Sequence, residues 1–97
     1  MRIEWTVEAA DELDRMLTYI AAQDTYAADL IAERVMKAEE NILHFPKAGS
    51  YDAETDTYDR YIPKTRIVLT YAIRDDIIWV ITAWHTSRDP ATKPVRS

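Results

Sequence analysis

The sequence predicts an α+β fold in which one strand and two helices precede three further strands. Three observations predict it. Apolar residues alternate over a short N-terminal segment, recur with helical spacing over about forty residues, and alternate again in the last third of the chain. A chain of 97 residues forms one domain with one core. We therefore expect residues 1–97 to form a single α+β domain, with 86–97 as a C-terminal tail.

The first strand is predicted at residues 2–6, where Ile3 and Trp5 fall on one side. Thr6 suits the N-cap of a helix that runs to about Gln23, because its hydroxyl can accept a bond from a free backbone N–H. Apolar residues of this helix follow the i, i+3, i+4, i+7 spacing: Ala10, Leu13, Met16, Leu17 and Ile20.

A second helix is predicted to begin at Asp24 or Thr25 and to end before Pro46 and Gly49. Its apolar stripe comprises Ala27, Ile31, Val35, Ala38, Ile42 and Phe45. Because only a few residues separate the two helices, we expect them to fold back on each other as an antiparallel pair.

Residues 47–56 are polar and without periodicity, which predicts a surface loop. Strands are then predicted at Thr57–Ile62, Arg66–Ile73 and Ile77–Trp84, and the last is apolar on both faces, as expected of an interior strand. Residues 74–76 supply a turn, although they lack the Asn-Gly pair of the tightest hairpins. If the strand Arg66–Ile73 pairs with the strand Ile77–Trp84, Arg66 at the start of the first lies near His85 at the end of the second.

The composition excludes several classes of protein. Without cysteine there is no disulfide framework or thiolate chemistry, and a structural zinc site is disfavoured. Neither His44 nor His85 has metal-ligand neighbours in the sequence, so we expect no metal and no cofactor. The longest aliphatic and aromatic run, Ile77–Ile81, is too short to cross a membrane, and the N-terminus lacks the apolar run of a signal peptide. We expect a cytoplasmic protein.

Charge is distributed unevenly along the chain, whose net charge is −5. Residues 1–59 carry five Lys/Arg against fourteen Asp/Glu, whereas residues 60–97 carry seven against three. One interpretation is chance segregation on a solvated surface. The interpretation that we favour is that the C-terminal part faces an anionic partner.

Five short segments of the sequence, taken in order, match the pattern of a known protein family. They are the strand end and acidic, Ala-rich helix start Trp5–Leu13, the helix end Tyr19–Ala21, the Pro-x-x-Gly segment Phe45–Gly49, the strand Arg66–Tyr71 and the His-x-x-Arg segment Trp84–Pro90. In this order they resemble the ParE/RelE toxin superfamily. The resemblance implies an N-terminal strand and an antiparallel helical hairpin packed on a small antiparallel sheet. It also implies the toxin of a type II toxin–antitoxin, or plasmid stabilisation, system.

The two branches of this superfamily imply different functions. The ParE branch implies inhibition of DNA gyrase by protein–protein contact, without a catalytic set. The RelE branch implies ribosome-dependent cleavage of mRNA, with His85 as the acid, Arg66 and Arg88 as cations, and one of three carboxylates as the base. These carboxylates are Glu54, Asp56 and Asp59. We favour the ParE branch because a net charge of −5 opposes binding to ribosomal RNA. An inactive member kept as part of a repressor complex is a third alternative.

The resemblance also implies a cognate, ParD-like antitoxin that folds as it binds and that accounts for any DNA association. We expect it to contact an apolar and acidic groove between the helices and the sheet. Candidate antitoxin contacts are Leu13, Leu17, Leu30 and Trp84, and candidate target contacts are Arg66, His85 and Arg88. The aromatic residues Tyr51, Tyr58 and Tyr61 could stack on bases. We prefer a packing role for these tyrosines, and we assign no function to His44, which suits the end of a helix.

Overall fold

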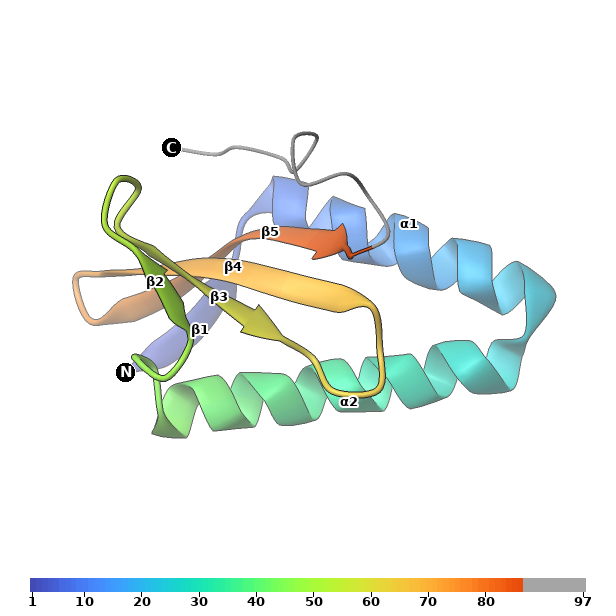
Figure 1. Cartoon of the computed structure of the whole chain (residues 1–97). Coiled ribbons are helices and arrows are strands. Elements are labelled where there is room, and N and C mark those ends of the chain that lie inside the picture. The colour runs from blue at the N-terminus through green and yellow to red at the C-terminus, as the bar shows by residue number, and fades with distance from the viewer. Residues whose placement is uncertain (87–97) are drawn as a thin grey trace.

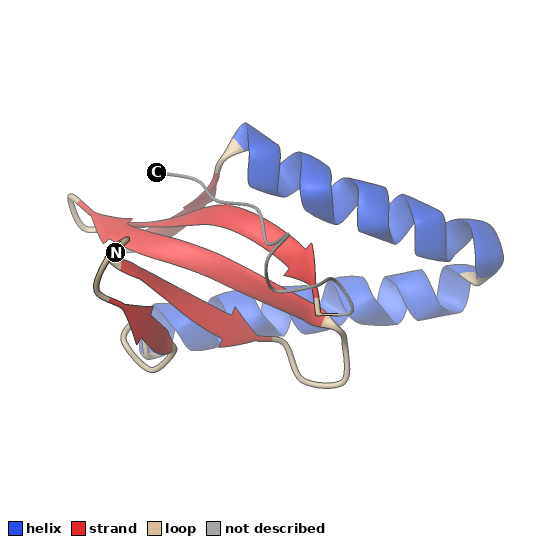
Figure 2. Cartoon of the chain, turned by 45° about the horizontal axis from the view of Figure 1, so that its top comes forward, coloured by secondary structure: helices blue, strands red, loops and turns tan. Residues whose placement is uncertain are grey.

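The computed structural model describes residues 1–86 and has two layers, a helical hairpin and a five-stranded sheet (Figures 1 and 2). The elements in chain order are β1 (Arg2–Trp5), α1 (Val7–Gln23), α2 (Thr25–His44), β2 (Ser50–Asp52), β3 (Thr57–Tyr61), β4 (Ile67–Arg74) and β5 (Ile77–His85). The turn between the helices projects well beyond the ends of the strands (Figure 1). The predicted α+β class is confirmed. Within the described residues no helix is long and apolar enough to cross a membrane.

The sheet has the strand order β1-β5-β4-β3-β2. It is mixed rather than wholly antiparallel, because β1 pairs in parallel with β5 while the other neighbours are antiparallel. The three-residue strand β2 lies in the segment predicted as a loop. Its residues are all exposed and polar or aromatic, so no alternation of buried positions marks them as a strand.

Two side chains set the ends of the helices, as the sequence predicts. The Thr6 hydroxyl accepts a bond from the Ala9 N–H (3.2 Å) and caps α1. Asp24 ends α1 through its own N–H, which donates to the Ile20 carbonyl (2.8 Å). The Asp24 carboxylate also accepts a bond from the Ala27 N–H (3.1 Å) and so caps α2. One residue therefore makes the whole connection between the helices.

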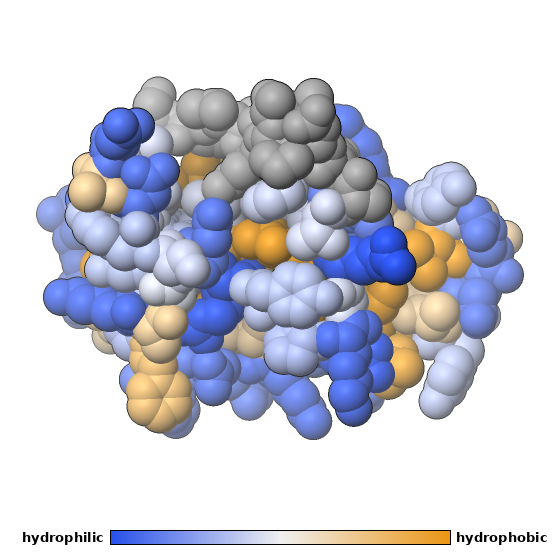
Figure 3. All heavy atoms as spheres, in the orientation of Figure 1, coloured by the Kyte–Doolittle hydropathy of each residue, from blue (hydrophilic) through white to orange (hydrophobic). Residues whose placement is uncertain are grey.

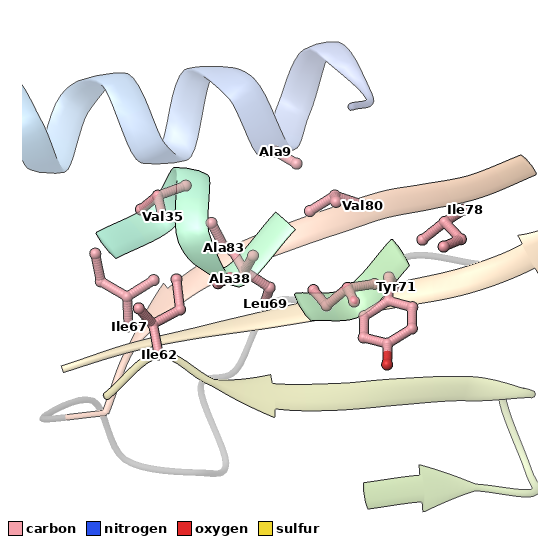
Figure 4. Close-up of a cluster of buried hydrophobic side chains, with 11 residues drawn as sticks. Ala9, Val35, Ala38, Ile62, Ile67, Leu69, Tyr71, Ile78, Val80 and Ala83 are labelled. Atoms are coloured by element: carbon pink, nitrogen blue, oxygen red, sulfur yellow. The ribbon is translucent and has the colours of Figure 1, made fainter. Parts of the chain in front are cut away.

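The hydrophobic core lies between the helices and the sheet (Figure 4). Its buried members are Ala9, Val35, Ala38, Ile42, Ile62, Ile67, Leu69, Tyr71, Ile78, Val80 and Ala83. Small residues at Ala9 and Ala38 bring the helix backbones close to the strands. Strand β4 is buried on both faces from Ile67 to Ala72, which agrees with its place in the middle of the sheet.

The β4–β5 hairpin closes with a two-residue turn, Asp75-Asp76, between the paired residues Arg74 and Ile77. Both aspartates have positive φ, 52° and 63°, a conformation that Asn and Gly adopt at lower cost. We expect the double change Asp75→Asn and Asp76→Gly to raise the free energy of unfolding by about 1 kcal/mol. Urea denaturation measures it. The double change Asp14→Asn and Asp29→Asn, at exposed positions on the helices, controls for the loss of two negative charges, and equal stability of the turn variant and wild type would contradict the expectation.

Candidate functional site

Arg66 and His85 lie side by side at one end of the sheet, where β4 begins and β5 ends. His85 pairs with Ile67, and the Thr86 N–H donates to the Arg66 carbonyl (2.7 Å). The strand register inferred from the sequence therefore brings these two candidate target contacts together. The third candidate, Arg88, lies outside the described residues.

Both residues line a cavity of about 360 Å³ between the helical hairpin and this end of the sheet. Its lining residues are Met16, Ile20, Ile31, Tyr61, Lys64, Thr65, Arg66, Ile67 and His85. The helix side is apolar and the sheet side carries cations. The groove is apolar, as expected. The expectation that it is also acidic is wrong, because its described lining carries cations and no carboxylate.

A second cavity, of about 440 Å³, continues the first along α2, because Tyr61 and Lys64 line both. Its lining residues are Arg34, Lys37, Ala38, Asn41, Arg60, Tyr61, Pro63 and Lys64. We refer to the two cavities together as the basic groove. The described lining holds five Lys/Arg and one His but no Asp or Glu, in a chain whose net charge is −5.

The β3–β4 turn forms one wall of the basic groove and lies beside the middle of α2 (Figure 1). The Ile62 N–H donates to the Ile67 carbonyl (2.9 Å), and the Thr65 hydroxyl donates to the Ile62 carbonyl (2.7 Å). From the helix side, Arg34 Nη1 donates to the Lys64 carbonyl (3.0 Å). These bonds hold Lys64 at a φ of 61°, which is a left-handed conformation that a lysine seldom adopts.

Arg60 joins the end of α2 to the sheet at the far end of the groove. Its Nη1 donates to Asn41 Oδ1 (2.6 Å), and its Nη2 donates to the Phe45 carbonyl (2.8 Å) and lies 3.5 Å from the Tyr71 hydroxyl. The Tyr71 hydroxyl itself donates to the Pro46 carbonyl (2.7 Å). Burial raises the pKa of Tyr71, and the neighbouring Arg60 partly opposes this rise.

The three candidate bases of the ribonuclease alternative do not line the cavity that holds His85. Glu54 and Asp56 precede β3, whereas the cavity lies at the other end of this strand, about 13 Å away at 3.3 Å per residue. Asp59 accepts a bond from the Thr70 hydroxyl (2.6 Å) within the sheet. The described cavity therefore offers an imidazole and cations, but no carboxylate to take up a proton.

The four candidate antitoxin contacts do not share one surface. Leu13 packs against the core, and Leu17 and Leu30 are half-buried on the helices. Trp84 is half-buried on β5. Neighbouring strand residues point to opposite faces and His85 lines the cavity on the helix side, so Trp84 faces away from the helices. Apolar side chains do gather between the helices beyond the end of the sheet (Figure 3).

Two of the three tyrosines considered for base stacking pack against other aromatic rings. Tyr51 and Tyr58 lie 4.9 Å apart between ring centroids, and Tyr58 stacks on the buried Tyr71 at 5.4 Å. A hydrogen bond from Tyr51 to Asp56 (2.8 Å) raises the pKa of Tyr51. These contacts support the packing role. Tyr61 is different, because it is exposed and lines both cavities of the basic groove.

Sequence reasoning missed the four cations of the second cavity, Arg34, Lys37, Arg60 and Lys64. One available signal was that Arg34 and Lys37 are the only Lys or Arg residues of α2 and lie about one turn apart. Their approach to Arg60 and Lys64 is a tertiary contact that no local pattern reports. Within the described part of the chain, no group of three or more His, Cys, Asp or Glu could hold a metal ion.

The architecture and the groove define a small α+β protein with cationic side chains around a groove between its helices and its sheet. A family model described as the ParE toxin of the type II toxin–antitoxin system parDE matches residues 3–90, so the chain belongs to this toxin family. A solved structure, titled as a chromosomal ParDE TA system from P. aeruginosa, has a similar fold, with a TM-score of 0.75 and 11% identity over 88% of this chain and 95% of that chain. No curated protein matches the sequence. The resemblance and the preference for the ParE branch are confirmed.

Proposed function

We propose that this toxin inhibits DNA gyrase by protein–protein contact and that a cognate, ParD-like antitoxin neutralises it. Membership of the ParE family carries the proposal. The lining of the cavity around His85 supports it, because general acid–base catalysis needs a base as well as an acid, and the described residues of this lining include no carboxylate. Inhibition by contact needs only a complementary surface.

The charge distribution supports a protein target over ribosomal RNA. Neutralising the phosphates of RNA requires Lys or Arg side chains, and a net charge of −5 opposes the approach of a long polyanion. The basic groove is local, and it suits a partner that presents a few negative charges at one place. Arg66 and His85 at its end are the proposed target contacts, together with Arg88.

The antitoxin is proposed to cover the same end of the molecule. Leu17 and Leu30 are half-buried apolar residues on the helices, and with Leu13 they are proposed contacts on that side. Trp84 would contact a separate part of the antitoxin on the other face of the sheet. An antitoxin that occupies the groove beside Arg66 would block the target surface directly. Any association with DNA is proposed to be indirect, through the antitoxin.

Inducing the toxin in cells that lack the antitoxin tests this proposal. DNA damage response and bulk protein synthesis are followed together after induction, and purified gyrase is assayed for supercoiling in parallel. An early damage response with translation intact supports gyrase as the target. Early loss of translation with cleaved mRNA would favour the ribonuclease alternative, and normal growth would favour an inactive member.

The adjacent Arg66 and His85 make the ribonuclease alternative specific enough to test by mutation. We expect His85→Ala to change toxicity and gyrase inhibition by no more than about threefold, because most single contacts in a protein–protein interface contribute little. Removal of a catalytic acid would instead lower activity by about 100-fold or more. The 50% inhibitory concentration in a supercoiling assay measures the difference, and Lys47→Ala on the exposed loop after α2 serves as the control. A 100-fold loss of toxicity without a change in gyrase inhibition would contradict the proposed mechanism.

A further inference from the structure

We infer that the second cavity of the basic groove, between α2 and the β3–β4 turn, is a binding site for a nucleoside di- or triphosphate. The phosphates lie among the cations of this cavity, and the base lies against the ring of Tyr61. The cavity volume of about 440 Å³ is within the range that small ligands occupy. This site does not depend on the gyrase and antitoxin contacts proposed above, so a failure of those contacts leaves it standing.

The cations of the second cavity have no counterions among the described residues. Four of them line it: Arg34, Lys37, Arg60 and Lys64. The ion pairs of the described residues involve only the N-terminus, Arg2 and Arg74 as cations. Four like charges around one cavity repel one another, and the described lining includes no carboxylate to oppose this repulsion. A bound anion removes it.

Both arginines are held by neutral acceptors, so their charges are not compensated within the described structure. Arg34 Nη1 donates to the Lys64 carbonyl (3.0 Å). The terminal nitrogens of Arg60 donate to Asn41 Oδ1 (2.6 Å) and to the Phe45 carbonyl (2.8 Å). The Nε of Arg60 is buried and has no hydrogen-bond partner among the described residues. A partly buried guanidinium without an opposite charge is unfavourable, and a ligand that supplies this charge stabilises it. Because the arginines are already fixed, binding requires little further ordering of them.

The concentration of positive charge favours phosphate groups over a single carboxylate. A carboxylate carries one negative charge, whereas one phosphate monoester carries about −1.5 to −2 at neutral pH, and each further phosphate adds to this. The planar fork of arginine matches the oxygen atoms of a phosphate, and lysine binds phosphate as a point charge. Two arginines and two lysines around one cavity therefore match the charge of a di- or triphosphate.

Tyr61 offers a surface for a base in the same cavity. Its side chain is 51% exposed, and no other aromatic ring of the described residues contacts it. The Tyr61 hydroxyl donates to the Thr65 carbonyl, which holds the ring against the β3–β4 turn. The turn itself is fixed, because the Thr65 hydroxyl donates to the Ile62 carbonyl (2.7 Å). Exposed aromatic rings are the surfaces on which bases stack, so Tyr61 can add a contact that inorganic phosphates cannot make.

The charge outside the cavity favours a free nucleotide over a nucleic acid. Residues 1–59, which include both helices, carry fourteen Asp/Glu against five Lys/Arg. This excess of negative charge opposes a polyanion that extends beyond the cavity. A single nucleotide keeps its phosphates within reach of the four cations.

Two double variants with the same change in net charge test the phosphate contacts. The cavity variant carries Lys37→Glu and Lys64→Glu, and the control variant carries Arg15→Glu and Lys47→Glu, which are exposed and do not line the cavity. Calorimetry with the purified toxin measures the dissociation constant for ADP in a buffer without divalent cations. We expect wild type to bind ADP with a dissociation constant of about 100 μM or below. The cavity variant should bind about tenfold more weakly or worse, and the control variant should stay within about twofold of wild type.

The base contact is tested by comparing ADP with pyrophosphate, which has the phosphates alone. We expect wild type to bind ADP about fivefold more tightly than pyrophosphate, or better, because a stacked base adds to the affinity. Tyr61→Ala should remove this difference, and Tyr61→Phe, which keeps the ring, should retain it. Changes in amide chemical shifts on addition of ADP should concentrate in α2 and in the β3–β4 turn.

Several outcomes would overturn the inference. A dissociation constant for ADP above about 1 mM, or equal binding by wild type and the cavity variant, excludes a nucleotide site in this cavity. Equal affinity of wild type for ADP and pyrophosphate overturns it in favour of an inorganic polyphosphate. Tighter binding of a single-stranded oligonucleotide that the cavity variant loses overturns it in favour of a nucleic-acid site. Thermal unfolding verifies that the variants fold, and Lys37→Glu alone repeats the test if the double variant is unstable.

Discussion

Replacing Gly49 with alanine is expected to lower the free energy of unfolding by about 2–4 kcal/mol. A Cβ atom at this position would lie 2.6 Å from the carbonyl oxygen of Asp59 and 3.3 Å from the Tyr71 hydroxyl oxygen. The first contact is with the backbone of a paired strand, since Ser50 and Asp59 are partners in the β2–β3 ladder. Strand β3 cannot move away from the methyl group without breaking its hydrogen bonds to β4.

Urea denaturation of wild type and Gly49→Ala measures this loss. Ser50→Ala is the matched control, because Ser50 is the exposed residue that follows Gly49 and begins β2, and a smaller side chain there meets no obstacle. A loss below about 1 kcal/mol for Gly49→Ala would show that the loop after α2 relaxes at little cost. The predicted loss of stability also has a consequence for the groove, because a displaced β3 carries Arg60 away from Asn41.

The helices could be predicted almost completely because their signals are local. Thr6 and Asp24 are caps that act within three residues of the chain, and the apolar stripes repeat every three or four residues. The strands of the β4–β5 hairpin are local in the same sense, and their register placed Arg66 next to His85.

The parallel pairing of β1 with β5 could not be predicted in the same way. The residues of β1 alternate as a strand should, but alternation does not say which strand is the neighbour or in which direction it runs. Arg2 pairs with Ile77, and the two residues are separated by most of the chain. Strand β2 was missed for a different reason, since none of its three residues is buried.

The electrostatic character of the site was predicted only in part. Counting charges by segment assigned an acidic character to the helical hairpin, and hence to the groove beside it. Side chains on a helix point in different directions, however, so a helix with more acidic than basic residues can still present its cations on one side. Arg34 and Lys37 do so, and the β3–β4 turn adds Lys64 from thirty residues further along the chain.

Replacing Tyr71 is expected to have the largest effect of any single change. Tyr71→Ala should lower the free energy of unfolding by about 3–5 kcal/mol, because the ring is fully buried in the core and stacks on Tyr58. Tyr71→Phe keeps the ring and loses only the hydroxyl, which donates to the Pro46 carbonyl at 2.7 Å. We expect this variant to lose about 1–2 kcal/mol, since a partly buried carbonyl is left without its donor.

The pH dependence of the free energy of unfolding separates the contribution of the Tyr71 hydroxyl from that of its ring. Burial raises the pKa of Tyr71 above its ordinary value of 10, so the folded state retains this proton at a pH where the unfolded state has lost it. The contribution to stability is complete below pH 10 and is lost as the pH rises through the raised value. Unfolding by urea at about pH 8 and about pH 11 should therefore show a smaller fall for Tyr71→Phe than for wild type. Tyr26→Phe, at an exposed ring on α2, is the control, and an equal fall in wild type and Tyr71→Phe would contradict the assignment of this proton to Tyr71. The same Tyr71→Phe variant deprives Arg60 of one contact, so a parallel weakening of antitoxin binding would connect the core to the groove through this arginine.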